Sequence, residues 1–178
     1  MRPAFFMMAL GLMTASLAHA NVCKVALGVA VVAGLEGEEI CKAGGAAHCD
    51  FVTLGEGACK AGGASHCDGV TVGEGICRGG GAAASTCREV SIPEGICLGG
   101  GAGGCKGIIQ LGEAFCKAGG GAGCKGVTMA QGVCKAGGIQ CADGATTFGE
   151  AICRAMGATN CAAAEPLTEA RALLNRCY

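Results

Sequence analysis

Polar and apolar residues recur along the chain in a unit of 18 to 20 residues, clearest in TLGEGACKAGGASHCDGV from residue 53 to 70. A glutamate or glutamine, which we call the anchor, marks each copy, and consecutive anchors are spaced by 18, 18, 20, 19, 18, 19 and 19 residues. A fixed short period predicts a solenoid, in which each unit buries its apolar face by stacking on its neighbours. The anchors are Glu38, Glu56, Glu74, Glu94, Glu113, Gln131, Glu150 and Glu169.

Each unit carries the signals of a short helix. A serine or threonine three residues before the anchor completes a capping box, and a base four residues after it forms an i,i+4 pair that also suits the helix dipole. Glycines then follow where a left-handed C-cap belongs. The caps are Thr53, Thr71, Ser91, Thr128 and Thr147; the pairs are Glu38–Lys42, Glu56–Lys60, Glu74–Arg78, Glu113–Lys117 and Glu150–Arg154; the glycines include Gly62-Gly63, Gly80 and Gly119-Gly120.

These signals predict a helix of about eight residues, which is marginal alone and needs tertiary support. The residues between one helix and the next, here called the return segment, lead the chain to the next cap, with a turn at Asp68-Gly69. A left-handed β-helix is the alternative, because its coils can also hold 18 residues. It needs an apolar residue at every sixth position, and Leu54, Lys60 and His66 break that pattern. The sequence therefore favours a mainly α solenoid of about seven repeats over residues 37–161.

The two ends differ from the repeats. Residues 1–20 have Arg2, an apolar run and Ala18-His19-Ala20, which is typical of a cleaved signal peptide. For residues 21–36 we predict an N-terminal cap that covers the first coil, with a self-association segment as the alternative. Residues 162–178 predict a C-terminal capping helix, with a proline in its first turn and one apolar face. That proline is Pro166, and the predicted face comprises Leu167, Ala170 and Leu174.

The amino-acid composition indicates the cellular compartment of the protein. The chain has 16 Cys and 35 Gly but no Trp, one Tyr and five Phe. Such a chain buries little apolar area and needs crosslinks, and an even, dense cysteine set in an exported protein indicates disulfides. We therefore expect a secreted or periplasmic protein. The formal net charge of −1 becomes −2 when Arg2 is removed, and no basic patch suggests nucleic acid. No apolar run is long enough for a stable membrane span.

The cysteines form two classes, one three residues after each anchor and one on the return segments. Pairing within units would leave Cys23 and Cys177 alone at opposite ends of a linear array, and pairing neighbours in sequence would join like classes at both ends. We therefore favour an interleaved scheme in which each bridge staples adjacent coils. Its pairs are Cys23–Cys49, Cys41–Cys67, Cys59–Cys87, Cys77–Cys105, Cys97–Cys124, Cys116–Cys141, Cys134–Cys161 and Cys153–Cys177.

Candidate chemistry is sparse. No G-x-S-x-G, H-E-x-x-H or P-loop is present, so we expect neither catalysis nor a cofactor. The triplets His48-Cys49-Asp50 and His66-Cys67-Asp68 suggest zinc or copper binding only if their thiols are reduced.

Three functions remain, in this order. The first is an exported structural or interaction scaffold with an extracellular or periplasmic partner whose identity the sequence does not give. The second is a repetitive surface that binds ice or a glycan, although the regularly placed threonines serve as helix caps and Gln110 replaces one of them. The third is metal binding through His48 and His66.

Overall fold

A computed structural model describes residues 22–141 and 146–178, so the predicted signal peptide at 1–20 lies outside the described residues. Within those two ranges the chain forms nine helices and no strands, which confirms the mainly α solenoid and excludes the β-helix for that part. The helices are α2 (Ala26–Ala33), α3 (Gly37–Ala43), α4 (Leu54–Ala61), α5 (Val72–Gly79), α6 (Ile92–Gly99), α7 (Leu111–Ala118), α8 (Met129–Ala136), α9 (Phe148–Ala155) and α10 (Pro166–Cys177).

All five predicted capping boxes are present. In α5, for example, the Glu74 N–H donates to Thr71 Oγ1 at 3.3 Å, and the Thr71 N–H donates to Glu74 Oε2 at 3.0 Å. Each reciprocal pair satisfies two backbone donors that the first turn of a helix leaves open. The start of each such helix is therefore specified locally by four residues.

The glycine pairs that end the helices do two separate jobs. Gly62 keeps a helical φ of −81°, while Gly63 takes the left-handed φ of +73°. The Gly63 N–H donates to Lys60 O at 2.9 Å and the Ala64 N–H to Cys59 O at 3.3 Å, which is a Schellman motif. The left-handed position is thus the second glycine, one residue later than the C-cap itself.

The first glycine of each pair, and glycines inside the helices such as Gly75, permit close packing of neighbouring helices. A Cβ on Gly62 would overlap the backbone of Gly79 at the end of α5, and a Cβ on Gly75 would overlap the carbonyl of Gly55 in α4. Helix ends therefore meet helix ends, and first turns meet first turns, so adjacent helices run parallel and in register. Aligned dipoles repel, and the acidic first turns and basic last turns of most repeats offset that repulsion.

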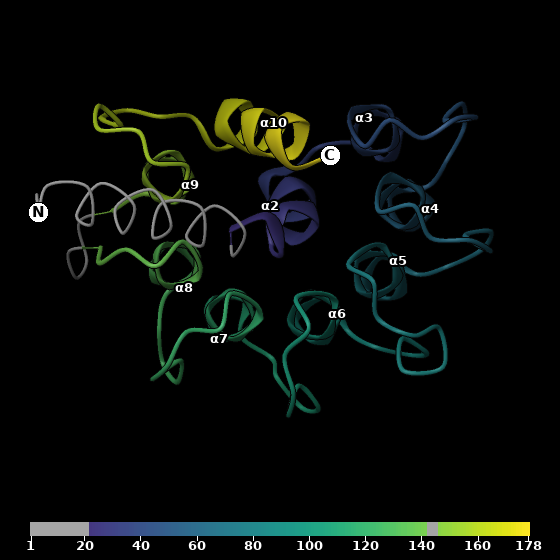
Figure 1. The fold of residues 1–178 in the computed structure, drawn as a ribbon, viewed down its shortest axis with the longest axis horizontal. Helices are drawn as coiled ribbons and strands as arrows, with labels where there is room; N and C mark the ends of the chain where they lie inside the picture. The colour runs from purple at the N-terminus through teal and green to yellow at the C-terminus, as the bar shows by residue number, and fades with distance from the viewer. Residues whose placement is uncertain (1–21, 142–145) are drawn as a thin grey trace, which may run out of the picture.

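The repeats curve around helix α2 instead of extending in a line (Figure 1). Seven of the side chains two positions after the anchors, Ala58 and six larger ones, are fully or nearly buried and belong to the same apolar core as α2. Helix α2 is apolar along its whole length, and a Cβ on its Gly28 would meet Ile96 and Phe115 of the surrounding repeats. The six larger side chains are Ile40, Ile76, Ile96, Phe115, Val133 and Ile152.

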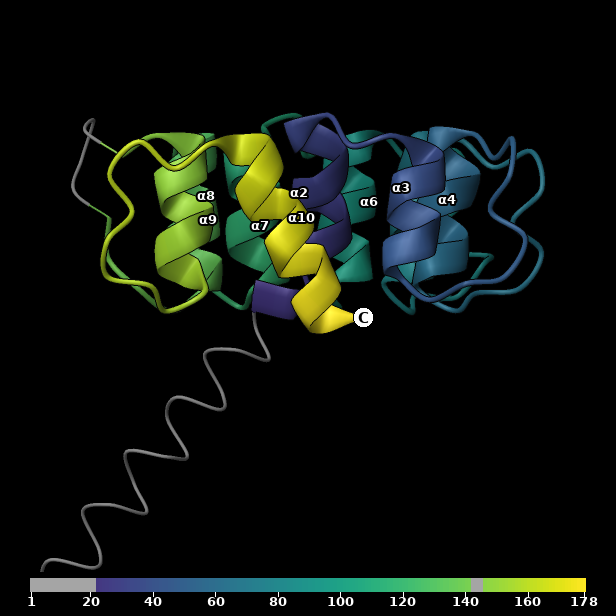
Figure 2. The same cartoon turned by 90° about the horizontal axis from the view of Figure 1, so that it is seen from above.

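This arrangement corrects the role expected for residues 21–36. Helix α2 packs on α10 and also contacts α4, α5 and α6, so it is the axis of the fold and not a lid on the first coil (Figure 2). Residues 26 to 31 are buried, so the alternative of an exposed self-association segment is wrong as well.

Helix α10 closes the ring. It begins at Pro166 as predicted, packs on α9 and α2, and reaches α3, where Arg171 Nη2 lies 2.7 Å from Glu39 Oε1. The predicted apolar face was wrong at one position, because Leu167 is 41% exposed. The buried residues of the helix are Ala170, Leu173 and Leu174.

All sixteen cysteines form disulfides, but the interleaved connectivity is wrong. Each helix cysteine pairs with the return cysteine of its own unit, and the two cysteines that this leaves over pair with each other, with their Cα atoms 5.3 Å apart. The prediction failed because it assumed a linear array, whereas the ring brings the two ends together. The bridges are Cys23–Cys177, Cys41–Cys49, Cys59–Cys67, Cys77–Cys87, Cys97–Cys105, Cys116–Cys124, Cys134–Cys141 and Cys153–Cys161.

The two kinds of bridge contribute differently to stability. A local bridge with a sequence separation of 8 removes roughly 2.5 kcal/mol of unfolded-state entropy in the chain-entropy model. The Cys23–Cys177 bridge, with a separation of 154, removes about 5 kcal/mol by the same relation. The ring-closing bridge is therefore the single largest covalent constraint.

Candidate functional site

The anchor glutamates fasten each helix to its own return segment. Glu56 Oε2 accepts from the Thr53 N–H at 2.9 Å, and its Oε1 accepts from the Gly69 N–H at 2.8 Å. The Gly69 and Thr53 N–H groups hold the pKa of Glu56 below its ordinary value, because they stabilise the carboxylate. Glu74 and Glu94 make the same bonds and have lowered pKa values for the same reason. These carboxylates are structural anions and poor proton donors.

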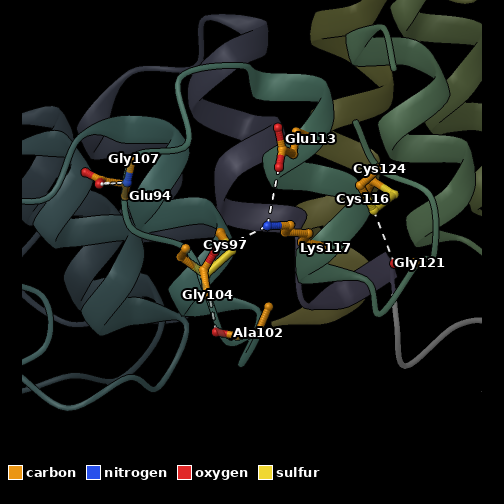
Figure 3. A network of polar contacts seen from close by, with 11 residues as sticks. Glu94, Cys97, Ala102, Gly104, Gly107, Glu113, Cys116, Lys117, Gly121 and Cys124 are labelled. Carbon is orange, nitrogen blue, oxygen red and sulfur yellow. Dashed lines mark hydrogen bonds and ion pairs between the residues drawn. A yellow bond between two sulfur atoms is a disulfide. The ribbon is translucent and has the colours of Figure 1, made fainter. Parts of the chain in front are cut away.

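The bases near the helix ends fasten each helix to the return segment of the preceding unit. Lys60 Nζ donates to His48 O at 3.0 Å, and Arg78 Nη1 donates to His66 O at 2.9 Å. Lys117 does both of its expected tasks: it lies 3.3 Å from Glu113 Oε1 and donates to Gly104 O at 3.2 Å (Figure 3).

Only two of the five predicted i,i+4 ion pairs are within 4 Å in the part of the chain that the structure describes, Glu38–Lys42 and Glu113–Lys117. The same distance criterion is not met by the other three predicted pairs, Glu56–Lys60, Glu74–Arg78 and Glu150–Arg154. Lys60 and Arg78 turn to backbone carbonyls of the preceding unit, where the hydrogen bond holds two repeats together.

The two histidines of the H-C-D triplets lie exposed on separate return segments, with left-handed φ values of 58° at His48 and 59° at His66. Their neighbours Cys49 and Cys67 are oxidised to disulfides and offer no thiolate. Over residues 22–141 and 146–178, no group of three or more His, Cys, Asp or Glu side chains is placed to hold a metal ion.

The threonines expected on an ice- or glycan-binding face are occupied as helix caps. Five cap hydroxyls accept backbone N–H groups, and because the repeats curve around α2 these hydroxyls follow an arc and not a straight ladder. Gln110 makes no side-chain cap, and α7 begins without one.

Departures from the repeat mark the surface features that the fold does not require. Phe51 stands thirteen residues after its anchor, at the position that is Gly69, Gly107 and Gly126 in other units. It keeps the left-handed conformation of those glycines, with a φ of 59°, and its side chain is 97% exposed. A non-glycine residue in this region is strained by roughly 1–2 kcal/mol.

A second departure lies around α6. Leu98 replaces the base of the other repeats, and Ile109, an extra residue in the following return segment, is 86% exposed. A cavity of about 520 Å³ opens beside Leu98 between the return segments on either side of α6. Its apolar part comes from Val90, Leu98 and Cys105, and Arg88 and Lys106 line it as well.

Sequence reasoning missed both departures, although the signal was available. Aligning the units on their anchors and return cysteines shows glycine at three described positions of the Phe51 column, Glu89 and Ala163 at two others, and Phe51 as its only large apolar residue among the described units, while Leu98 is the exception in a basic column.

No protein-family model matches the chain, and neither curated proteins nor solved structures show significant similarity to it. Among the described helices, none is long and apolar enough to cross a membrane.

Proposed function

We propose that this protein is an exported, non-catalytic scaffold, a covalently closed ring that holds its return segments in fixed positions for interaction with other macromolecules. Eight disulfides are consistent with an oxidising compartment outside the cytoplasm. The polar side chains that recur in the repeats are engaged in helix caps and in bonds between repeats, which leaves the outer loops as the variable part.

The observation that carries this proposal is Phe51. An exposed apolar side chain is ordinary by itself, but this one occupies a backbone conformation that glycine adopts without strain in three other units. Stability alone would favour glycine at this position. A strained aromatic side chain on a rigid loop is instead typical of an interaction anchor, because aromatic residues supply large contact areas at small entropic cost.

The test uses Phe51→Gly, a substitution that the protein's own repeats contain. Oxidised wild-type and variant rings would be immobilised and exposed to a surface or matrix extract of the producing cells. We expect the variant to be more stable by about 1 kcal/mol, because backbone strain is removed, and to capture less of the bound partner. The matched control is Ser85→Ala, an exposed loop substitution outside a strained position. Equal capture by wild type and Phe51→Gly, with the partner lost only on reduction, would place the binding surface elsewhere. No capture above a blank resin would contradict the proposal.

A further inference from the structure

The loop that carries Phe51 presents an exposed aromatic side chain beside Asp50, and the cavity beside Leu98 has apolar lining with Arg88 and Lys106 exposed at its rim. We propose that Phe51 of one ring inserts into the Leu98 cavity of a second copy, so that the rings associate head to tail. This inference rests on the proposed scaffold function and names its partner. We call residues 50–51 the knob, and the cavity lined by Arg88, Val90, Glu94, Leu98, Cys105 and Lys106 the socket.

The socket exists because one base is missing. In the next unit, Lys117 extends across the surface to Gly104 O, and Lys60 and Arg78 reach the return segments before them in the same way. Leu98 is shorter and ends in methyl groups, so the space that a lysine head would fill is open. Val90 and Leu98 are each partly buried and present apolar surface to it.

The knob supplies a matching side chain. Phe51 has the most exposed large apolar side chain among the described residues. Its backbone N–H donates to Glu38 Oε1 at 2.8 Å, which holds the backbone in place. The disulfide Cys41–Cys49 fixes the loop two residues away. The backbone that carries the Phe51 side chain is therefore already ordered, which lowers the entropy lost on docking.

The charged residues beside the knob and the socket differ in sign. The residue after each return cysteine is acidic on one arc of the ring, at Asp50 and Asp68, and basic on the next, at Arg88, Lys106 and Lys125. Asp50 and Phe51 are adjacent and exposed, and Arg88 and Lys106 are exposed at the socket. Docking thus brings an acidic flank to a basic rim.

The socket also holds Glu89 and Glu94, so its charged lining has no net formal charge and the attraction is local, between Asp50 and the exposed Arg88 and Lys106. Glu94 is engaged by the N–H groups of Ser91 and Gly107 and by Ser91 Oγ. Glu89 is exposed at the edge of the socket, where its carboxylate can turn to solvent or to the neighbouring Arg88.

The knob lies on the return segment after α3 and the socket lies beside α6, so the contact is heterologous. Each ring keeps a free socket after its knob is used, and association continues to chains or to a closed ring of rings. One aromatic anchor is a small interface, which predicts weak, concentration-dependent assembly.

The experiment measures molar mass by sedimentation of the oxidised protein from about 10 μM to about 1 mM, the range in which a small interface associates. Wild type should grow in mass with concentration, and less so when salt rises from about 50 mM to about 500 mM. Phe51→Gly removes the knob, and Leu98→Lys restores the base of the other repeats and fills the socket. Both variants should remain monomeric.

Mixing the two variants gives the decisive result. Phe51→Gly retains a socket and Leu98→Lys retains a knob, so an equimolar mixture should form a species of twice the monomer mass and no larger. A mixture that stays monomeric, or a Phe51→Gly variant that assembles like wild type, overturns the proposal. If the rings stay monomeric while Phe51→Gly still loses capture of a foreign partner, self-association is wrong and the scaffold function stands.

Discussion

The packing of neighbouring helices through glycine predicts the effect of Gly75→Ala. The added Cβ would lie 2.7 Å from the carbonyl carbon and 2.9 Å from the Cα of Gly55, and would overlap its carbonyl oxygen. Ordinary contact begins near 3.4 Å, so α4 and α5 must separate by about 0.7 Å or more. Both contacting groups are backbone, and no side chain can turn aside to relieve the overlap.

Two opposing terms decide the sign. Alanine improves helix propensity over glycine by about 1 kcal/mol, and overpacking costs about 1–3 kcal/mol. We take the upper end, because rigid backbone meets rigid backbone, which gives a net loss of about 2 kcal/mol. For a chain of this size that lowers Tm by roughly 4–8 °C.

The assay is thermal unfolding of the oxidised protein followed by circular dichroism. The matched control is Gly103→Ala, because a Cβ there has no atom within 4 Å and φ is not left-handed. The control should be neutral or slightly stabilising. A Gly75→Ala variant as stable as wild type would refute the reasoning, because it would show that the added Cβ does not force α4 and α5 apart.

Three further predictions follow. Phe115→Ala should cost about 3–5 kcal/mol in denaturant unfolding, because this side chain is fully buried against α2, and a loss below about 1 kcal/mol would contradict a central core. Glu74→Gln should flatten the acid limb of the stability curve: the Thr71 and Glu89 N–H groups lower the pKa of Glu74, so its contribution is present above its ordinary pKa and is lost as pH falls through the lowered one. An unchanged acid limb would count against the bridging role. The double variant Cys23→Ser and Cys177→Ser should lower Tm more than removal of any one local bridge, and an equal loss would argue against ring closure.

Local structure was predictable because its causes are local. The capping boxes, the two-turn helices and the position of Pro166 each depend on residues within one turn, and the sequence places those residues at fixed offsets. The glycine pairs were also recognisable in the sequence as helix stops. The role of the first glycine in close packing was not, because it depends on a neighbouring helix.

Global closure was not predictable from the same signals. By spacing, Cys23 belongs with the helix cysteines and Cys177 with the return cysteines at opposite ends of the chain, and only the curvature of the array brings them together. Curvature arises from the wedge between small glycine contacts and the larger side chains facing α2, such as Ile96 and Phe115, and it accumulates over seven repeats. The apolar pattern of residues 25–33 is the same for a helix that covers the end of an array and for a helix buried at the centre of a ring, so the sequence does not distinguish the two.

The candidate site illustrates the opposite case. Leu98 breaks the basic column of the repeat and Phe51 is a large apolar residue where three units have glycine, so both positions could have been noticed in the sequence. Their meaning could not, because exposure at Phe51 and the cavity at Leu98 depend on how the return segments lie on the ring.

Ring closure is tested most directly by tryptic mapping of the unreduced protein. Cleavage after Lys24 and Arg176 releases Cys23 on a peptide ending at Lys24 and releases Cys177 within the dipeptide Cys177-Tyr178. The closed ring predicts that these two short peptides are joined to each other and to nothing else. Recovery of Cys23 joined to the peptide that contains Cys49, with Cys177 joined to the peptide that contains Cys153, would show a linear, interleaved array and contradict the account.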